Sequence, residues 1–137
     1  YVMIDSTVVR AHACSAGYGD QNEHGLGRSK GGFTSKIHAK VDAFGVATDS
    51  YVLCDKGYDS DEFRNKIRSQ KCIPVIPGKC NRIVPIEYDK HIYKERSLVE
   101  CFFSKIKHFR RVFSRYDKDV CSFMAFLCFT GAIIWLR

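Results

Sequence analysis

Three carboxylates in this sequence have the residue types and setting needed for phosphodiester chemistry. Asp5 and Asp55 each follow a short apolar run, and Glu100 lies in the stretch YKERSLVECFFSKIK. Carboxylate oxygens are the hard ligands that Mg²⁺ prefers. If the three converge, they can hold divalent cations roughly 4 Å apart, an arrangement that promotes displacement at phosphorus. We therefore hypothesise a metal-dependent site that cleaves or joins phosphodiester bonds.

The residues around Glu100 follow the spacing Y-x2-R-x3-E-x6-K. On an ideal helix Tyr93, Arg96, Glu100 and Lys107 fall within roughly 60° of one another. The alternative is an ordinary surface ion pair between Arg96 and Glu100, worth a few tenths of a kcal/mol. We expect one helix from Tyr93 to Lys107 and beyond, with an apolar face that docks on a core, formed by Leu98, Val99, Phe102, Ile106, Phe109 and Phe113.

Two predicted strands would position the aspartates. The run YVMID is expected to end at Asp5, and YVLCD is expected to end at Asp55. Active sites of α/β folds collect at the carboxyl ends of strands, which favours a shared location for both side chains. Each aspartate also has a plain alternative as a turn or capping residue.

The remaining pattern predicts a mixed α/β sheet flanked by helices. Residues 33–41 alternate apolar and polar side chains as a half-buried strand does, and residues 72–77 predict another strand. A short helix is expected after an N-cap at Asp59 or Ser60, and the Gly-rich residues 14–32 are expected to form a loop. The apolar stretch from Val120 to Leu136 is short for a bilayer span, so a buried core helix is favoured.

Composition indicates one globular domain over residues 1–137, because 45% of the residues are hydrophobic and 13% aromatic. The net charge of +7 is local: residues 79–118 hold eleven Lys or Arg against five Asp or Glu. Tyr and Phe interleave with these charges, which is typical of a nucleic-acid-binding surface, although a merely solvated basic face has the same composition.

Seven cysteines without a C-x-x-C pair indicate unpaired thiols in a reducing cytoplasm. A zinc site built from His12, Cys14 and His24 would lack a second pair of ligands.

Seven blocks in order resemble an insertion-sequence transposase with a DDE domain. They are DST after a strand, GRSKGGFTSKIHA, DKGYDSDEFR, PVIP, the Y-x2-R-x3-E-x6-K helix, FRRVFSRYDK and AIIWLR. The resemblance covers almost the whole chain.

The resemblance implies a ribonuclease H-like fold and an enzyme that cuts and joins double-stranded DNA, at transposon ends and target, with two Mg²⁺ ions or Mn²⁺ in their place. It also implies a homodimer on DNA. With the cysteines and the short apolar stretch, we expect a cytoplasmic location and no membrane partner. The catalytic and metal-binding residues would be Asp5, Asp55 and Glu100, and the DNA-binding residues would be Tyr93, Arg96, Lys107, Arg110 and Arg111.

The sequence departs from the family in ways that favour impaired or absent activity. A segment matching one strand and one helix is expected to be lost between Ala43 and Ser50. Cys101 stands where the family often has arginine, and the chain is expected to lack the N-terminal part that binds terminal repeats. Two further hypotheses remain at this point: a non-catalytic, basic DNA-binding remnant, and a small membrane-associated protein built on residues 120–136.

Overall fold

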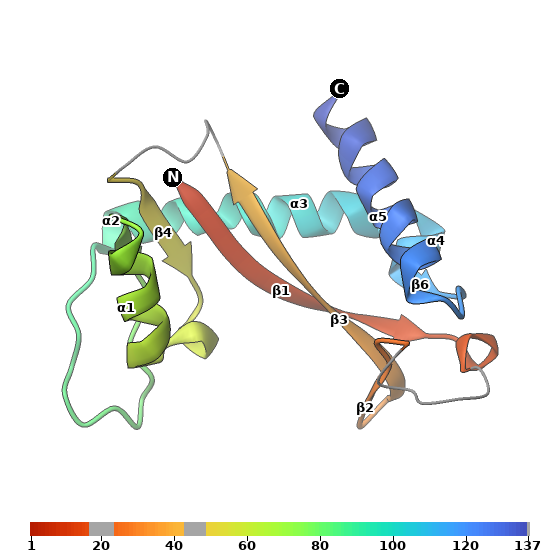
Figure 1. The fold of residues 1–137 in the computed structure, drawn as a ribbon, viewed down its shortest axis with the longest axis horizontal. Helices are drawn as coiled ribbons and strands as arrows, with labels where there is room; N and C mark the ends of the chain where they lie inside the picture. The colour runs from red at the N-terminus through yellow and green to blue at the C-terminus, as the bar shows by residue number, and fades with distance from the viewer. Residues whose placement is uncertain (17–23, 43–48, 137) are drawn as a thin grey trace. The chain divides into compact units, whose positions relative to one another are not determined.

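The computed structural model describes residues 1–16, 24–42 and 49–136, which form a sheet and several helices (Figure 1). The strands are β1 (Val2–Ala11), β2 (Gly27–Ser29), β3 (Gly32–Asp42), β4 (Tyr51–Cys54), β5 (Ile73–Val75) and β6 (Ser114–Arg115). The α-helices are α1 (Asp61–Ser69), α2 (Lys90–Tyr93), α3 (Ser97–Lys107), α4 (Arg110–Phe113) and α5 (Val120–Trp135). Short 3-10 turns lie at Ala13–Ser15, Lys56–Tyr58 and Lys94–Arg96.

The six strands form one mixed sheet in the order β2-β3-β1-β4-β5, and β6 pairs with the end of β1. The pairs β1 with β4, β4 with β5, and β1 with β6 are parallel, whereas β2 and β3 are antiparallel. Parallel neighbours need a crossover, and α1 supplies it between β4 and β5. The predicted mixed α/β class is therefore confirmed. The predicted loss between Ala43 and Ser50 falls largely on residues 43–48, which lie outside the described residues.

The chain divides into two compact units that share strands β1 and β3 and helix α3. The first comprises Tyr1–Asp5 and His38–Glu100, and the second comprises Ser6–Ile37 and Cys101–Arg137.

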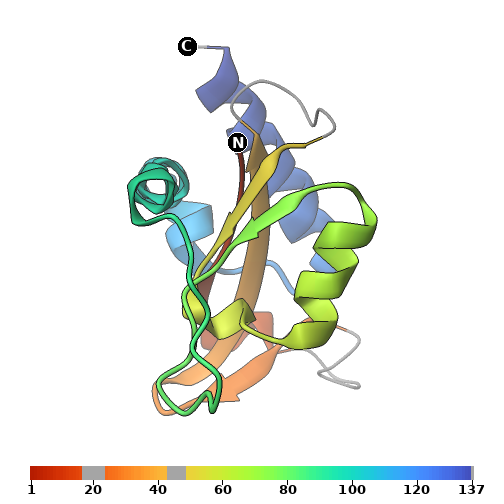
Figure 2. The same cartoon turned by 90° about the vertical axis from the view of Figure 1, so that its left-hand side faces the viewer.

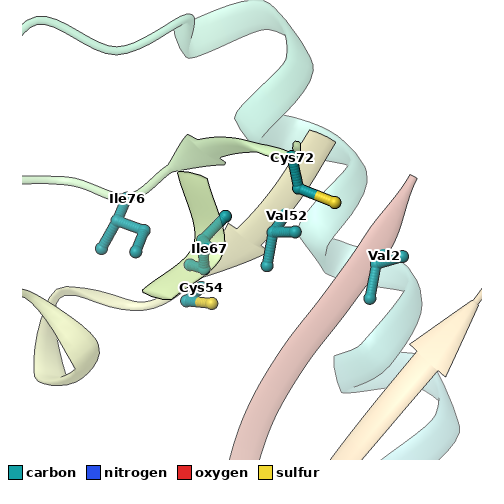
Figure 3. Packing of buried hydrophobic residues seen from close by; sticks show 6 residues of the cluster. All are labelled: Val2, Val52, Cys54, Ile67, Cys72 and Ile76. Atoms are coloured by element: carbon teal, nitrogen blue, oxygen red, sulfur yellow. The ribbon is translucent and has the colours of Figure 1, made fainter. Parts of the chain in front are cut away.

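The first unit is built on β4, β5 and α1, which lie together in Figure 2. Its core combines side chains from β1, β4, α1 and the β5 region, namely Val2, Val52, Cys54, Ile67, Cys72 and Ile76 (Figure 3). Helix α1 begins at the N-cap Ser60, whose hydroxyl accepts a hydrogen bond from the Phe63 amide at 3.2 Å. The burial of this apolar cluster holds β4 in place, and with it Asp55, the residue that follows β4.

The second unit has a buried arginine at its centre. Arg115, at the end of β6, donates to the Ser35 hydroxyl at 2.8 Å and to the carbonyls of Asp117 and Lys118 at 2.9 and 3.0 Å. Its guanidinium also lies over the Phe123 ring of α5, 5.0 Å from the centroid. Burial lowers the pKa of Arg115. These bonds tie β3, β6 and α5 together within this unit.

Several sequence expectations about the strands and the Tyr93 helix were wrong. Strand β1 does not end at Asp5, because the β-branched residues that follow extend it to Ala11. The Gly-rich segment contains strand β2, which pairs with the start of β3. The expected single helix from Tyr93 is instead α2, a 3-10 turn and α3. Leu98 and Phe113, expected on the buried face, are 47% and 66% exposed.

Helix α5 also differs from expectation. Of its side chains, Phe123 and Thr130 are buried, whereas Met124, Phe129 and Trp135 are exposed. The helix is apolar on all sides, so its sequence does not specify which side is covered. None of the described helices has both the length and the apolarity needed to cross a membrane.

Candidate active site

The register between β1 and β4 brings two of the predicted site residues to neighbouring positions. The parallel pairs are Val2 with Val52, Met3 with Leu53, and Ile4 with Cys54. Asp5 and Asp55 are the next residue along each strand, so both come where the ladder between β1 and β4 ends. Burial raises the pKa of the Cys54 thiol to about 12, and the negative charges of Asp55 and Asp5 add to this effect. The predicted convergence of the two aspartates rests on this register.

Asp55 also has the capping role that was the plain alternative. It is the N-cap of the 3-10 turn Lys56–Tyr58, and its Oδ1 accepts a hydrogen bond from the Gly57 amide at 2.6 Å. A Cβ atom at Gly57 would lie 2.8 Å from this Oδ1. Glycine at position 57 therefore leaves room for the carboxylate in its observed orientation.

Arg96 connects the other two carboxylates. Its Nη1 donates to Asp5 Oδ2 at 2.7 Å, and its Nη2 donates to Glu100 Oε1. The Asp5 side chain is 12% exposed and that of Glu100 is 55% exposed. The i,i+4 pair that the sequence indicated is therefore present, and Asp5 adds a partner 91 residues away. Because Arg96 reaches from the 3-10 turn to Asp5 on β1, Asp5 and Glu100 bind the same guanidinium.

Burial and the surrounding charges both affect the pKa of Arg96. Burial opposes the charged form of Arg96, but Tyr93, Glu100, Asp5 and Asp55 together raise its pKa. The guanidinium lies 5.7 Å from the centroid of the Tyr93 ring. Burial also raises the pKa of Tyr93, with Asp55 adding to the effect and Arg96 opposing it. Arg96 is therefore held between carboxylates and an aromatic ring.

The three predicted metal ligands supply the oxygen donors that Mg²⁺ and Mn²⁺ favour. Among residues 1–16, 24–42 and 49–136, however, no group of three or more His, Cys, Asp or Glu side chains is placed to hold a metal ion. In the observed arrangement Arg96, a cation of the protein itself, bridges Asp5 and Glu100. The chemistry of the donors fits a divalent cation, whereas the observed arrangement of Asp5 and Glu100 around Arg96 is that of an ion-pair cluster.

The other predicted DNA-binding residues belong to the second unit. Lys107 is half-buried at the end of α3, and Arg110 is exposed at the start of α4. Arg111 forms an ion pair with Asp117 and lies over the Phe126 ring, 4.8 Å from the centroid. These side chains lie at or near the surface, and their role in DNA binding remains a prediction.

Sequence reasoning missed a buried ion-pair network that supports the loop after Asp55. Asp59 accepts from Arg64 Nε at 2.9 Å, from Arg82 Nη1 at 3.0 Å and from the Lys79 amide at 2.9 Å. The Asp59 and Arg64 side chains are 1% and 2% exposed. Asp59 stood out in the sequence only as a candidate N-cap, and its distant partners left no local signal. The network fixes the chain between Asp55 and α1.

Comparison with known proteins identifies the family. The family model described as Transposase DDE domain matches residues 45–130. A relative described as a putative transposase for insertion sequence element IS6501, from Brucella ovis, is 33% identical over 129 residues, covering 76% of this chain and 99% of the relative. No solved structure gives a significant match. The chain belongs to the insertion-sequence DDE transposases, and its mixed sheet flanked by helices is consistent with the ribonuclease H-like fold of such domains.

Proposed function

We propose that the chain is a shortened copy of a DNA transposase catalytic domain, in which Asp5, Asp55 and Glu100 bind divalent cations for phosphodiester cleavage and strand transfer. Two observations support this proposal: Asp5 and Glu100 share one guanidinium, and Asp55 follows the strand that pairs with β1 up to Asp5. Bound Mg²⁺ or Mn²⁺ would supply activation of the attacking oxygen and stabilisation of the leaving oxygen.

Each side chain has a separate task in this proposal. Asp5, mostly buried on β1, gives the site a fixed oxygen ligand, and Asp55 gives a second one whose orientation the Gly57 amide sets. Glu100 supplies a more exposed ligand from α3. Tyr93 and Arg96 would meet the DNA backbone beside these ligands, because a guanidinium binds phosphate through its planar fork. Lys107, Arg110 and Arg111, which belong to the second unit, would also contact phosphates.

We further propose that activity is impaired. The alignment with the Brucella ovis relative is 129 residues long but includes only 76% of the 137 residues of this chain. Part of the relative therefore has no counterpart here, which supports the loss of a segment. Among the described residues, β3 pairs with β2 only over Gly32–Thr34, so the rest of its outer edge has no described partner strand. A strand edge that lacks a partner leaves backbone N–H and C=O groups outside the ladder, which weakens the sheet that carries Asp5.

The expected setting of this function is double-stranded DNA, namely transposon ends and target, bound by a homodimer that holds both ends. A cytoplasmic location is proposed with it. All seven cysteines lie among the described residues and are free thiols, which suits a reducing compartment.

The second candidate is a non-catalytic DNA-binding remnant. It is favoured by the ion-pair spacing of the carboxylates together with the basic charge of residues 79–118. In this case phosphate contacts would persist without any metal chemistry.

Fluorescence anisotropy with a labelled DNA duplex separates the two candidates. The wild type, Asp55→Asn and Asp5→Ala would be titrated at several salt concentrations with and without Mg²⁺. We expect Mg²⁺ to strengthen DNA binding by the wild type and to have little effect on either variant. Binding that falls with salt yet ignores both Mg²⁺ and the substitutions would support the remnant and contradict the catalytic-domain proposal.

A further inference from the structure

We propose that Arg96 is a displaceable internal cation, which holds Asp5 and Glu100 together in the metal-free protein and must release them before a divalent cation can bind. The inference rests on the proposed function and deepens it. It assigns Arg96 a positioning role in addition to the predicted phosphate contact.

Arg96 contacts two of the three proposed metal ligands. Its two terminal nitrogens are each directed at a different proposed metal ligand, Asp5 on β1 and Glu100 on α3. The Arg96 and Asp5 side chains are 19% and 12% exposed, so their 2.7 Å contact is largely shielded from water. Charge-assisted bonds of this kind are stronger than those between neutral groups. Arg96 therefore holds the two carboxylates in an ordered arrangement without a metal.

The charge balance carries the second step. Asp5, Asp55 and Glu100 would repel one another if no cation lay among them, and partial burial makes that repulsion stronger than at a solvated surface. A divalent cation that took the same oxygens would lie beside the guanidinium, and like charges at that distance repel. Metal binding and both Arg96 contacts therefore exclude each other.

The local backbone and Tyr93 offer a way for the exchange to occur. Arg96 ends the 3-10 turn that separates α2 from α3, and 3-10 segments within a helical stretch often act as hinges. The guanidinium also has a favourable contact with the Tyr93 ring that does not depend on the carboxylates. Tyr93 is itself braced by the edge of Tyr88, with ring centroids 5.4 Å apart. Arg96 can therefore leave Asp5 and Glu100 without losing every partner.

This role makes two measurable quantities move in opposite directions. Removing the guanidinium charge should lower the stability of the metal-free protein, because the carboxylates lose their shared counter-ion. The same change should increase metal affinity, because the metal no longer competes with Arg96. A purely structural role for Arg96 would instead weaken folding and metal binding together.

The experiment compares the wild type, Arg96→Gln and Arg96→Lys, with Arg68→Gln as the matched control. Arg68 is an exposed arginine of α1 in the same unit, bonded to Asn65 at 3.2 Å. Thermal melts give the stability of the metal-free proteins, and the electron paramagnetic resonance signal of free Mn²⁺ gives the dissociation constant.

We expect Arg96→Gln to melt at a lower temperature than the wild type without metal, and to bind Mn²⁺ at least tenfold more tightly. Arg68→Gln should match the wild type in Mn²⁺ affinity, which removes net charge as an explanation. If Arg96→Gln fails to fold, Arg96→Lys carries the test. It keeps the charge but loses the two-pronged contact, so its Mn²⁺ affinity should still exceed that of the wild type.

Two unfavourable results have different meanings. Mn²⁺ affinity that is unchanged or weaker in a folded Arg96 variant, while the wild type binds Mn²⁺, would overturn the displacement inference and leave the proposed function standing. Failure of the wild type and of every folded Arg96 variant to bind Mn²⁺ would overturn the metal site itself, and the inference with it.

Discussion

Replacing Asp59 with asparagine should destabilise the protein by about 3–5 kcal/mol, the usual cost of removing one partner from a buried ion pair. The magnitude follows from the burial of the pair, since the Asp59 and Arg64 side chains are 1% and 2% exposed. Asparagine would leave the Arg64 charge buried without its counter-charge. It would also turn an amide donor toward groups that now donate to Asp59. Such a loss is a large part of the 5–15 kcal/mol that typically stabilises a whole domain.

Urea denaturation followed by circular dichroism measures this effect, and Asp61→Asn is the matched control. Asp61 is two residues away and pairs with Arg82, but its side chain is 76% exposed. An exposed pair contributes about 0–1 kcal/mol, so the control should unfold near the wild-type midpoint. Equal costs for the two substitutions would refute the argument that burial makes Asp59 important.

A double variant keeps the test usable if Asp59→Asn does not fold. Changing Arg64 to Met in the same chain removes the unpaired charge and supplies apolar volume. We expect Asp59→Asn with Arg64→Met to be more stable than Asp59→Asn alone. No recovery in the double variant would show that the cost does not come from an uncompensated Arg64.

Three further predictions use the site and its surroundings. Burial raises the pKa of Asp59, but the hydrogen bond from the Lys79 amide and the charge of Arg64 outweigh it and hold the pKa below its ordinary 3.8. The stability that Asp59 contributes is therefore present above pH 3.8 and is lost as the pH falls through the lower pKa of the folded protein. An acid titration followed by circular dichroism should show this loss in the wild type and not in Asp59→Asn. Gly57→Ala would crowd Asp55 Oδ1, so it should reduce the rise in melting temperature that Mn²⁺ induces. The stability of the metal-free protein should change by less than about 1 kcal/mol. A Mn²⁺-induced rise as large as that of the wild type would contradict this. The pKa of about 12 keeps the buried Cys54 thiol protonated, whereas Cys101 is exposed. Mass spectrometry after iodoacetamide treatment at pH 8 should therefore find Cys101 labelled well before Cys54, and equal labelling of the two in the native protein would contradict this.

Local features of the site were predictable from the sequence because they depend on neighbours in the chain. Asp55 was expected to end a strand, and β4 ends one residue earlier, at Cys54, because the apolar β-rich run stops there before a glycine-containing turn. The Ser60 cap was one of the two expected N-caps of α1, and a hydroxyl just before an amphipathic stretch is a strong local signal. The Arg96–Glu100 pair follows directly from i,i+4 spacing.

Features that depend on distant partners were not predictable. Asp5 was placed at the end of its strand, yet β1 continues, and what ends near Asp5 is its pairing with β4. The contact of Arg96 with Asp5 joins residues 91 positions apart, and no local pattern indicates it. Uniform apolarity in α5 could not specify which residues would be covered, and Phe129 and Trp135 are exposed. Sequence periodicity indicates local structure, whereas these features are decided by tertiary packing.

The central claim is that Asp5, Asp55 and Glu100 form a divalent-metal site, and a thermal melt with and without Mn²⁺ tests it most directly. Asp55→Asn is the best comparison, because asparagine keeps an acceptor for the Gly57 amide while losing the charge. A ligand that binds only the folded protein raises its melting temperature. We predict that Mn²⁺ raises the melting temperature of the wild type and leaves that of Asp55→Asn unchanged. The same response in both proteins, or none in either, would contradict the claim.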